Sequence, residues 1–422
     1  MPSFPARYPA NSPPLSALLT RAGAWPKFPR PRNFNAGNQM ALDAETREQL
    51  ISSVRRFVDE RLRPIEDKVS ESDKVPDEIV EEMKELGLFG ISVPVEYGGL
   101  GLTMEEECLL MFELGRTSPA FRSVIGTNVG IGSQGIVMHG RQDQKEYWLP
   151  KIASGEVIVS FALTEPEAGS DAASLKATAI RDGDHYIVNG TKRYITNANK
   201  AHAFTLLART DPKTPGAKGV SAFIVPRDIP GIHVGKPEKK MGQQGAHICD
   251  VIFEDARIPA DCLLGDTEGR GFVTAMQVLE RGRLHISAVC IGVADRLVED
   301  SVKYAAERKQ FGAPIGNLQL VQAMLADSKM EAYAGRCMVL DAARRRDAGE
   351  DVATESSCCK LFCSEAVGRI ADRAVQVHGG AGYVADYGIE RFYRDVRIFR
   401  IYEGTSQVQQ VIIARNLLKA VS

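Results

Sequence analysis

Apolar residues recur at three- and four-residue steps in the first and last thirds of the chain. Between about 43 and 68, Leu50, Val54, Phe57 and Leu62 follow this spacing, which is typical of an amphipathic helix. The same period predicts further helices at about 76–88, 103–115, 119–138, 142–153, 271–306, 317–348, 353–378 and 405–418. Both ends of the chain are therefore expected to be helical.

The segment from about 157 to 258 has a different pattern. Short apolar runs, several alternating with polar residues, are separated by Gly, Asp and Pro turns, and such runs predict strands. The expected strands are 157–163, 176–181, 185–189, 203–209, 221–225 and 250–258, with Asn189 and Gly190 as a hairpin signal. The order α, β, α predicts an α+β multidomain fold, divided into residues 41–156, 157–270 and 271–422.

Composition narrows the possible functions. The 422 residues include 52 basic and 54 acidic ones, so no basic excess indicates nucleic-acid binding, and no apolar run is long enough for membrane insertion. The eight cysteines form no CxxC pair and no zinc-type cluster; Cys359 and Cys363 have the spacing of half a metal site, but buried free thiols are the better interpretation. We expect no metal and an intracellular protein, in a bacterial cytoplasm or alternatively the mitochondrial matrix.

Residues 1–40 differ from the rest of the chain, with five basic residues, no acidic residue and eight prolines. A basic start without acidic residues is typical of a transit peptide, whereas the prolines disfavour an amphipathic helix. The favoured interpretation is a disordered extension, or a start codon assigned too far upstream, with Met40 opening the folded protein.

The carboxylate of Glu403 directly precedes the last expected helix, which Thr405 or Ser406 can cap. Burial there would raise the pKa of the carboxyl group, and the helix dipole would lower it. If burial dominates, Glu403 is suited to act as a general base; otherwise it is an ordinary solvated glutamate. One face of this helix carries its apolar residues, Val408, Val411, Ile412, Leu417 and Leu418.

Four further segments carry groups that suit a nucleotide cofactor. Residues 161–171 leave a strand for a loop whose hydroxyl and N–H groups can bind a heteroaromatic ring, unless the loop is only a surface turn. Tyr194 and Thr196 share one face of the strand in 190–197, where they can pack beside a planar cofactor. The alternative is an ordinary strand with no ligand. Arg308 can bind a phosphate or satisfy the helix dipole, and Phe311 can pack on an adenine.

The fourth segment, 376–383, ends an expected helix with glycines that allow a ligand close to the backbone. It is not a Rossmann fingerprint, because a helix precedes it and the third glycine is missing. A nicotinamide-dependent dehydrogenase therefore has little support.

In this order, the four segments and the Glu403 motif resemble the acyl-CoA dehydrogenase family, from about residue 41 to the C-terminus. Residues 163–171 look like the family's first signature, and 376–382 with 402–405 look like its second. The resemblance implies an N-terminal helical domain, a central β-barrel-like or sandwich domain and a C-terminal four-helix bundle. It also implies FAD as the cofactor and a homotetramer.

The resemblance implies a role for individual residues. Glu403 would remove the α-proton of an acyl-CoA while the β-hydride moves to flavin N5, and its backbone N–H with a ribityl hydroxyl of FAD would stabilise the enolate. The product would be a trans-2-enoyl-CoA, and an electron-transfer flavoprotein would take the electrons. The implied substrate contacts are Ser170, Arg283, Glu403 and Gly404. The implied FAD contacts are Phe161, Leu163, Thr164, Ser170, Tyr194, Thr196, Arg308, Gln310, Phe311, Gln376, Gly379, Gly380, Thr405 and Gln407, with Arg308, Gln310 and Phe311 reaching the FAD of a neighbouring subunit.

Some family members carry the base on the helix that here includes 279–283. That position aligns with Gly282, which cannot be a base, and Glu280 would point elsewhere, so Glu403 is favoured. Tyr194 stands where many members have Trp, and Glu167 where many have Gly or Asn. Two alternatives stay open: a flavin acyl-CoA oxidase that uses oxygen, and a non-catalytic assembly protein that retains the fold.

Overall fold

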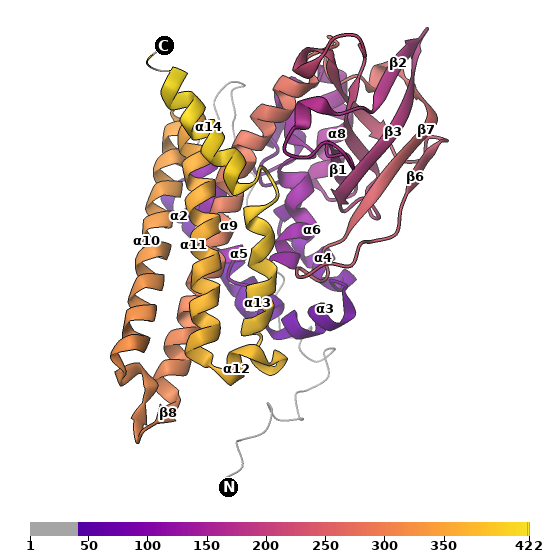
Figure 1. Cartoon of the computed structure of the whole chain (residues 1–422). Coiled ribbons are helices and arrows are strands. Elements are labelled where there is room, and N and C mark those ends of the chain that lie inside the picture. Colours follow the sequence, from indigo (N-terminus) through magenta and orange to yellow (C-terminus); the bar gives the residue numbers. More distant parts are fainter. Residues whose placement is uncertain (1–40, 420, 422) are drawn as a thin grey trace.

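The computed structural model describes residues 41–419 and 421, so the expected extension 1–40 lies outside the described residues. The N-terminal part is helical (Figure 1). The expected helix over 43–68 passes into a π-helical turn at Val58–Leu62, just before Pro64, whose ring and missing N–H disrupt a regular helix. Another expected helix, 119–138, is divided at Gly130. The α-helices are α2 (Ala44–Phe57), α3 (Glu66–Ser72), α4 (Asp77–Glu85), α5 (Met104–Leu114), α6 (Pro119–Val129), α7 (Gln134–His139) and α8 (Gln142–Ala153).

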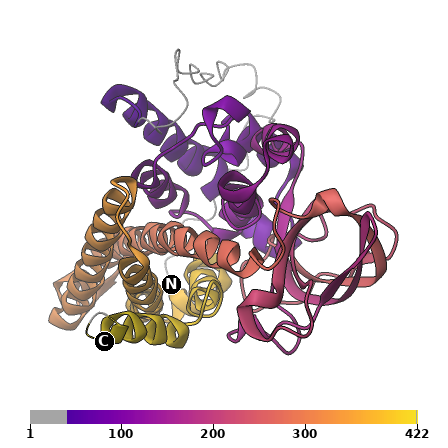
Figure 2. The same ribbon diagram turned by 90° about the horizontal axis from the view of Figure 1, so that it is seen from above.

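The middle part is one seven-stranded sheet, and Figure 2 shows it curling on itself beside the helices. The sheet order is β1-β4-β2-β3-β7-β6, with β5 paired to β4. The sequence pattern does not predict β6, because three residues are too few to show alternation. The strands are β1 (Val159–Ala162), β2 (Thr178–Asp182), β3 (His185–Thr196), β4 (Ala203–Arg209), β5 (Val220–Pro226), β6 (Ile232–Val234) and β7 (Ile248–Pro259).

The hairpin expected at Asn189 and Gly190 is wrong, because the chain continues through both residues as β3. The register with β7 shifts between Val188 and Gly190, so the pair marks a bulge. The Asn189 side chain exchanges two hydrogen bonds with Asp255 of β7 (2.9 and 2.8 Å). A Cβ at Gly190 would lie 2.6 Å from Cβ of Ala177, so the glycine permits close strand contact here.

The C-terminal part consists of three long helices and shorter ones packed on them (Figure 1). The helices α9 (Gly271–Glu307), α10 (Gln319–Asp347) and α11 (Ala353–His378) contact one another, and α13 (Ile389–Val396) and α14 (Ser406–Lys419) pack along α11. A short hairpin, β8 (Lys309–Gln310) and β9 (Ala313–Pro314), joins α9 to α10, and α12 (Gly380–Tyr383) follows α11. The observed order of helices, sheet and helices confirms the expected fold class.

The apolar face expected on α14 is not buried within this chain. Its buried residues are Ser406 and Gln409, whereas Leu417 and Leu418 are 61% and 69% exposed. Helical spacing identified the apolar stripe correctly, but it does not say which surface covers it.

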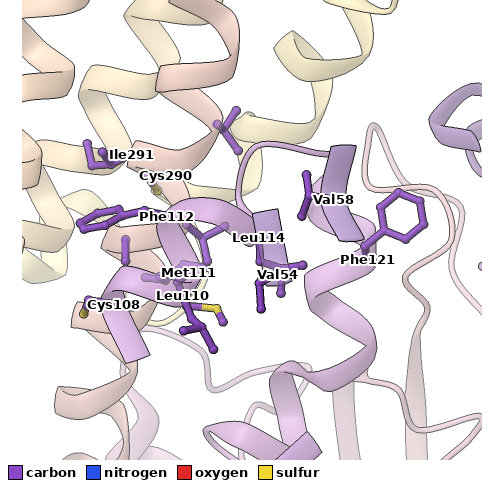
Figure 3. Packing of buried hydrophobic residues seen from close by; sticks show 14 of the residues in the cluster. Val54, Val58, Cys108, Leu110, Met111, Phe112, Leu114, Phe121, Cys290 and Ile291 are labelled. Carbon is purple, nitrogen blue, oxygen red and sulfur yellow. The ribbon is translucent and has the colours of Figure 1, made fainter. Parts of the chain in front are cut away.

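The N-terminal and C-terminal helices share one hydrophobic core. Figure 3 shows Phe112 and Leu114 of α5 lying beside Cys290 and Ile291 of α9. Gly292 allows these two helices to approach closely, because a Cβ at this position would lie only 2.4 Å from the carbonyl oxygen of Phe112. The sheet has a core of its own. Helix α9 runs through the shared core, and its first turns contact β5 at Ser221 and Ala222.

All eight cysteines are free; Cys359 and Cys363 are buried, whereas Cys337 is exposed. No helix among residues 41–419 is long and apolar enough to cross a membrane. Over the same part of the chain, no group of three or more His, Cys, Asp or Glu side chains is placed to hold a metal ion.

Candidate active site

Glu403 lies in a tight loop between α13 and α14, and the loop is held by hydrogen bonds. Glu403 and Gly404 both have positive φ angles, 55° and 90°. The side-chain amide of Gln409 donates to the carbonyl oxygens of Glu403 (3.2 Å) and Gly404 (3.1 Å), and Nζ of Lys360 donates to the same oxygen of Gly404 (2.7 Å). Thr405 caps the first turn of α14 through its hydroxyl oxygen, which confirms one of the two expected caps.

The carboxylate of Glu403 is directed at Gly282, in the N-terminal third of α9. A Cβ at Gly282 would lie 2.6 Å from Oε2 of Glu403, so only glycine leaves room for this side chain. The same oxygen is buried and has no hydrogen-bond partner among the described residues. Burial raises the pKa of Glu403 above its ordinary value, against the opposing charges of Arg122, Lys360 and Arg283. Burial thus dominates, which is the condition that makes the residue suitable as a general base.

Lys360 was not among the residues singled out from the sequence. It is fully buried on α11, and burial lowers the pKa of its ammonium group to about 8. A signal in the sequence could have identified Lys360. It lies beside Cys359 and one turn from Cys363, both buried, and a charged side chain is rarely placed on a helix face that packs into the core. Its bond to Gly404 fixes the loop, and its charge acts on Glu403.

A chain of buried polar groups crosses the site from α5 to α6, also missed by the sequence reasoning. Glu107 of α5 forms an ion pair with Arg281 and a hydrogen bond with Nδ1 of His285, both on α9. The other ring nitrogen of His285 accepts a hydrogen bond from Nε of Arg122 (2.8 Å). Burial and the nearby Arg122 lower the pKa of His285 to about 4, so the imidazole is neutral and both partners fix its tautomer.

Arg283 follows Gly282 on α9 and was expected to contact substrate. It is buried, and its Nε has no hydrogen-bond partner in the described part of the chain. One terminal nitrogen reaches Oγ of Ser357 at 3.5 Å. Ser170, the other expected substrate contact outside the Glu403 loop, is exposed on the loop after β1.

The expected flavin residues of the β-domain form one group beside the end of β3. The backbone N–H of Arg193 donates to the carbonyl oxygen of Thr164 (2.8 Å), which joins the loop after β1 to this strand. The register between β3 and β7 shifts between Lys192 and Ile195. Tyr194 lies in this irregular stretch with a φ of 58°, and its side chain is 56% exposed. The group consists of Phe161, Leu163, Thr164, Ser170, Tyr194 and Thr196.

A buried ion pair holds the loop of this group. Nζ of Lys192 donates to Oε1 of Glu165 (2.7 Å) and to the carbonyl oxygen of Leu163 (3.0 Å). The carboxylate of Glu165 also accepts hydrogen bonds from the backbone N–H groups of Lys176 (2.6 Å) and Ala177 (3.0 Å). One carboxylate thus connects the loop, β3 and the segment that leads into β2.

Thr405 and Gln407 lie at the start of α14, next to the Glu403 loop. The other expected cofactor residues lie at the opposite end of the helical layer, by the hairpin and α12 (Figure 1). Tyr304 of α9 stacks on His378 of α11 with ring centroids 4.3 Å apart, which holds the two helix ends together. Phe311 is 93% exposed with φ 52°, and the space around Gly379 and Gly380 is open. This second group consists of Arg308, Gln310, Phe311, Gln376, Gly379 and Gly380. A single chain does not bring it to the β-domain group.

Three family models match successive parts of the chain. They are the acyl-CoA dehydrogenase N-terminal domain at residues 44–156, the middle domain at 160–256 and the C-terminal domain at 269–418. The matches follow the order of the helical, β and helical parts described above.

Individual proteins agree with this assignment. The chain is 42% identical to the acryloyl-CoA reductase (NADH) of Anaerotignum propionicum, over 89% of this chain and 95% of that protein. It is 39% identical to the human mitochondrial short-chain specific acyl-CoA dehydrogenase, over 97% of each. A chain solved in a study of the electron transferring flavoprotein of Acidaminococcus fermentans superposes with a TM-score of 0.85 at 35% identity, covering 92% of this chain and 100% of that one. The protein described here belongs to the acyl-CoA dehydrogenase family.

Proposed function

We propose that this protein oxidises the Cα–Cβ bond of an acyl-CoA thioester to a trans-2-enoyl-CoA, with Glu403 as the base. The observation that carries the proposal is the buried, unpartnered Oε2 of Glu403, directed at Gly282 from a loop fixed on both sides. The α-proton of a thioester is weakly acidic, so a base with a raised pKa is better matched to it than a solvated glutamate.

The developing enolate needs a hydrogen-bond donor as well as a base. The backbone N–H of Glu403 has no acceptor among the described residues, and the residue itself adopts a left-handed conformation with φ 55°. A thioester oxygen placed there would accept a hydrogen bond from that N–H, while the α-carbon would lie next to the carboxylate of the same residue. One residue would thus supply both groups, and Gln409 and Lys360 would keep them in place.

FAD is the cofactor of this family, and the described residues fit it. When bound, it supplies a flavin N5 that accepts the hydride from the β-carbon. Tyr194 and Phe311 offer exposed aromatic faces, and the open backbone at Gly379 and Gly380 suits a pyrophosphate. Since the two groups of cofactor residues lie apart in one chain, we propose that FAD binds between subunits of a homotetramer.

An electron-transfer flavoprotein is the proposed electron acceptor, in line with the likeness to a chain solved in the study of such a flavoprotein. The reverse reaction, reduction of an enoyl thioester, is a second candidate because one relative is named a reductase. The proposal is tested by turnover of straight, branched, dicarboxylic and aromatic acyl-CoAs with an artificial acceptor, compared with air and with NADH plus enoyl-CoA. Absence of oxidation across the whole panel would overturn it.

Replacing Gly282 by alanine should displace the base without removing it. The new methyl group would overlap Oε2 of Glu403, and the side chain would have to rotate away. We expect kcat to fall by about 10- to 100-fold, since small displacements of a reacting group have effects of this size. Flavin absorbance per protein should stay at the wild-type level. Unchanged kcat would show that Glu403 does not act from the position seen here.

Removing the charge of Lys360 should move the pH dependence of the reaction. The wild-type acid limb of kcat/KM should lie above the ordinary glutamate pKa of 4.5, because burial raises the pKa of Glu403. The positive charge of Lys360 partly opposes that rise, so Lys360→Met should move the acid limb to higher pH. Lys360→Arg retains the charge and should leave the limb near its wild-type position. Identical limbs in the Met variant and the wild type would contradict the assignment.

A further inference from the structure

A cavity of about 320 Å³ lies between the N-terminal helices and the sheet, apart from the Glu403 site. Its apolar wall combines Val80 of α4, Val124 of α6, Ile158 just before β1 and the buried Phe89. Among the described residues that line it, none belongs to α9 or to the Glu403 loop. The elements that form this cavity therefore differ from those that hold the base.

Helix α6 separates the cavity from the active site. Arg122 donates to His285 of α9 on one side of the helix (2.8 Å), whereas Val124, two residues further on, lines the cavity. Residues two apart in an α-helix point to nearly opposite sides. The side-chain amide of Asn197, also in the cavity wall, donates to the carbonyl oxygen of Ser123 (2.8 Å) and joins α6 to the sheet. A molecule in the cavity would thus lie behind α6 as seen from the base.

Lys200 gives the cavity a cation without a partner. Its Nζ makes no hydrogen bond or ion pair within the described part of the chain, and Asp77, whose charge acts on it, is already paired with Lys74 (2.8 Å). Burial of the ammonium group lowers the pKa of Lys200 below its ordinary value, because the charge is partly removed from water. The other lysine of the wall, Lys84, is paired with Glu81 (2.9 Å). Lys200 is thus the lysine of this cavity that an anion can complete.

His202 adds a hydrogen-bond donor close to Lys200. Its Nδ1 accepts the backbone N–H of Ile158 (3.0 Å), so the ring carries a proton on Nε2, which has no acceptor among the described residues. Backbone hydrogen bonds fix the turn that carries both side chains: His202 N–H donates to the carbonyl oxygen of Ile158 (2.8 Å), and Lys200 N–H to that of Asn197 (2.8 Å). An ammonium group and an imidazole N–H on one fixed turn can bind the two oxygens of a carboxylate.

Acidic side chains at the cavity limit the charge of a suitable ligand. Asp77 and Glu156 also line it, and Glu156 has no cationic partner among the described residues. A phosphate ester or a dicarboxylate would bring further negative charge towards these acids, and like charges repel. The apolar wall favours a ligand with a hydrocarbon body. The cavity therefore matches one carboxylate on an apolar body.

We propose that this cavity is a second binding site, for a small apolar monocarboxylate whose carboxylate meets Lys200 and His202 and whose body packs on Val80 and Val124. The site is independent of the proposed reaction, because it shares no residue with the Glu403 site. The acid and an acyl-CoA should therefore bind at the same time. The acid released by hydrolysis of an acyl-CoA belongs to this class, and it would act as an effector from behind α6.

Calorimetry with the FAD-loaded protein and 3-phenylpropionate tests the site. The wild type should bind this acid. It should bind 3-phenylpropanamide, which lacks the charge, and inorganic phosphate, which lacks the body, at least about 10-fold more weakly. Lys200→Met should weaken binding of the acid by about 10- to 100-fold, the scale of a lost charge-assisted hydrogen bond, and Lys200→Arg should stay near the wild type. The matched control is Lys68→Met, which removes an exposed lysine of α3 and should bind the acid normally. Absence of binding by the wild type, equal affinity for acid and amide, or full affinity in Lys200→Met would overturn the proposal.

Competition distinguishes the cavity from the substrate site. In the Glu403→Gln background, 3-phenylpropionate should still bind at a saturating concentration of the acyl-CoA that the wild type turns over fastest. Complete displacement by that acyl-CoA would place the acid at the substrate site and contradict the inference. Val80→Phe, which fills the cavity from α4, should abolish binding of the acid, with flavin absorbance and thermal unfolding as checks of folding. A folded Val80→Phe variant that binds the acid normally would also contradict it. Failure of the proposed dehydrogenation would leave all of these binding results unchanged.

Discussion

Glu403→Gln should abolish turnover while leaving the protein able to bind FAD and acyl-CoA. The amide has the size of the carboxylate but cannot accept a proton, and the backbone N–H of the residue is unaffected. We expect kcat to fall by several orders of magnitude, at least about 10³-fold, because the step then lacks its general base. The measurements are turnover with an artificial acceptor, the flavin content of the purified protein, and the spectral change of the flavin on addition of acyl-CoA.

Glu280→Gln is the matched control for this variant. Glu280 lies two residues from Gly282 on α9, but its carboxylate forms an ion pair with Arg346 of α10 at 2.8 Å and is directed away from the loop of Glu403. The control should retain kcat within a few-fold of the wild type. Near-normal turnover in Glu403→Gln would exclude Glu403 as the base. A large loss in Glu280→Gln alone would place the base on α9 instead.

Lys192→Met should be the most destabilising single change in the β-domain. Lys192 is fully buried, and its removal leaves the carboxylate of Glu165 buried without its cation. Breaking a buried ion pair from one side costs about 3–5 kcal/mol of unfolding free energy. The loop from Leu163 to Ser170 would also lose its two side-chain attachments to β3 and keep only the backbone bond from Arg193 to Thr164, so we expect a lower flavin content in the purified variant. Chemical denaturation and flavin absorbance per protein measure the two effects.

Lys176→Met is the control for Lys192→Met, because it removes an exposed ion pair to the same loop. Lys176 pairs with Glu167, and the two side chains are 74% and 70% exposed. Exposed pairs contribute about 0–1 kcal/mol, so this variant should unfold close to the wild type and keep its flavin. Equal destabilisation of the two variants would show that burial of the Lys192 pair is not what secures the loop.

Local sequence patterns were sufficient for the order of elements. Three- and four-residue periodicity located the long helices α9, α10 and α11 within a few residues. In α10 and α11 the buried residues recur at helical spacing, whereas α9 is buried on all sides between Arg281 and Ala294. The pattern failed where a local signal has two structural solutions. Asn189 and Gly190 favour a hairpin, but pairing with Asp255 and contact with Ala177 make them a bulge inside a long strand. The apolar face of α14 was identified correctly and yet is exposed in the single chain.

The sequence by itself determined the fold class and Glu403 as the candidate base, because both depend on local patterns of residues close together in the chain. The tertiary structure alone decided what surrounds that base. Lys360 and Arg122 come from α11 and α6, and no spacing along the chain relates them. Their effect on Glu403 is electrostatic and depends on distance and burial, which arise only when distant helices pack together.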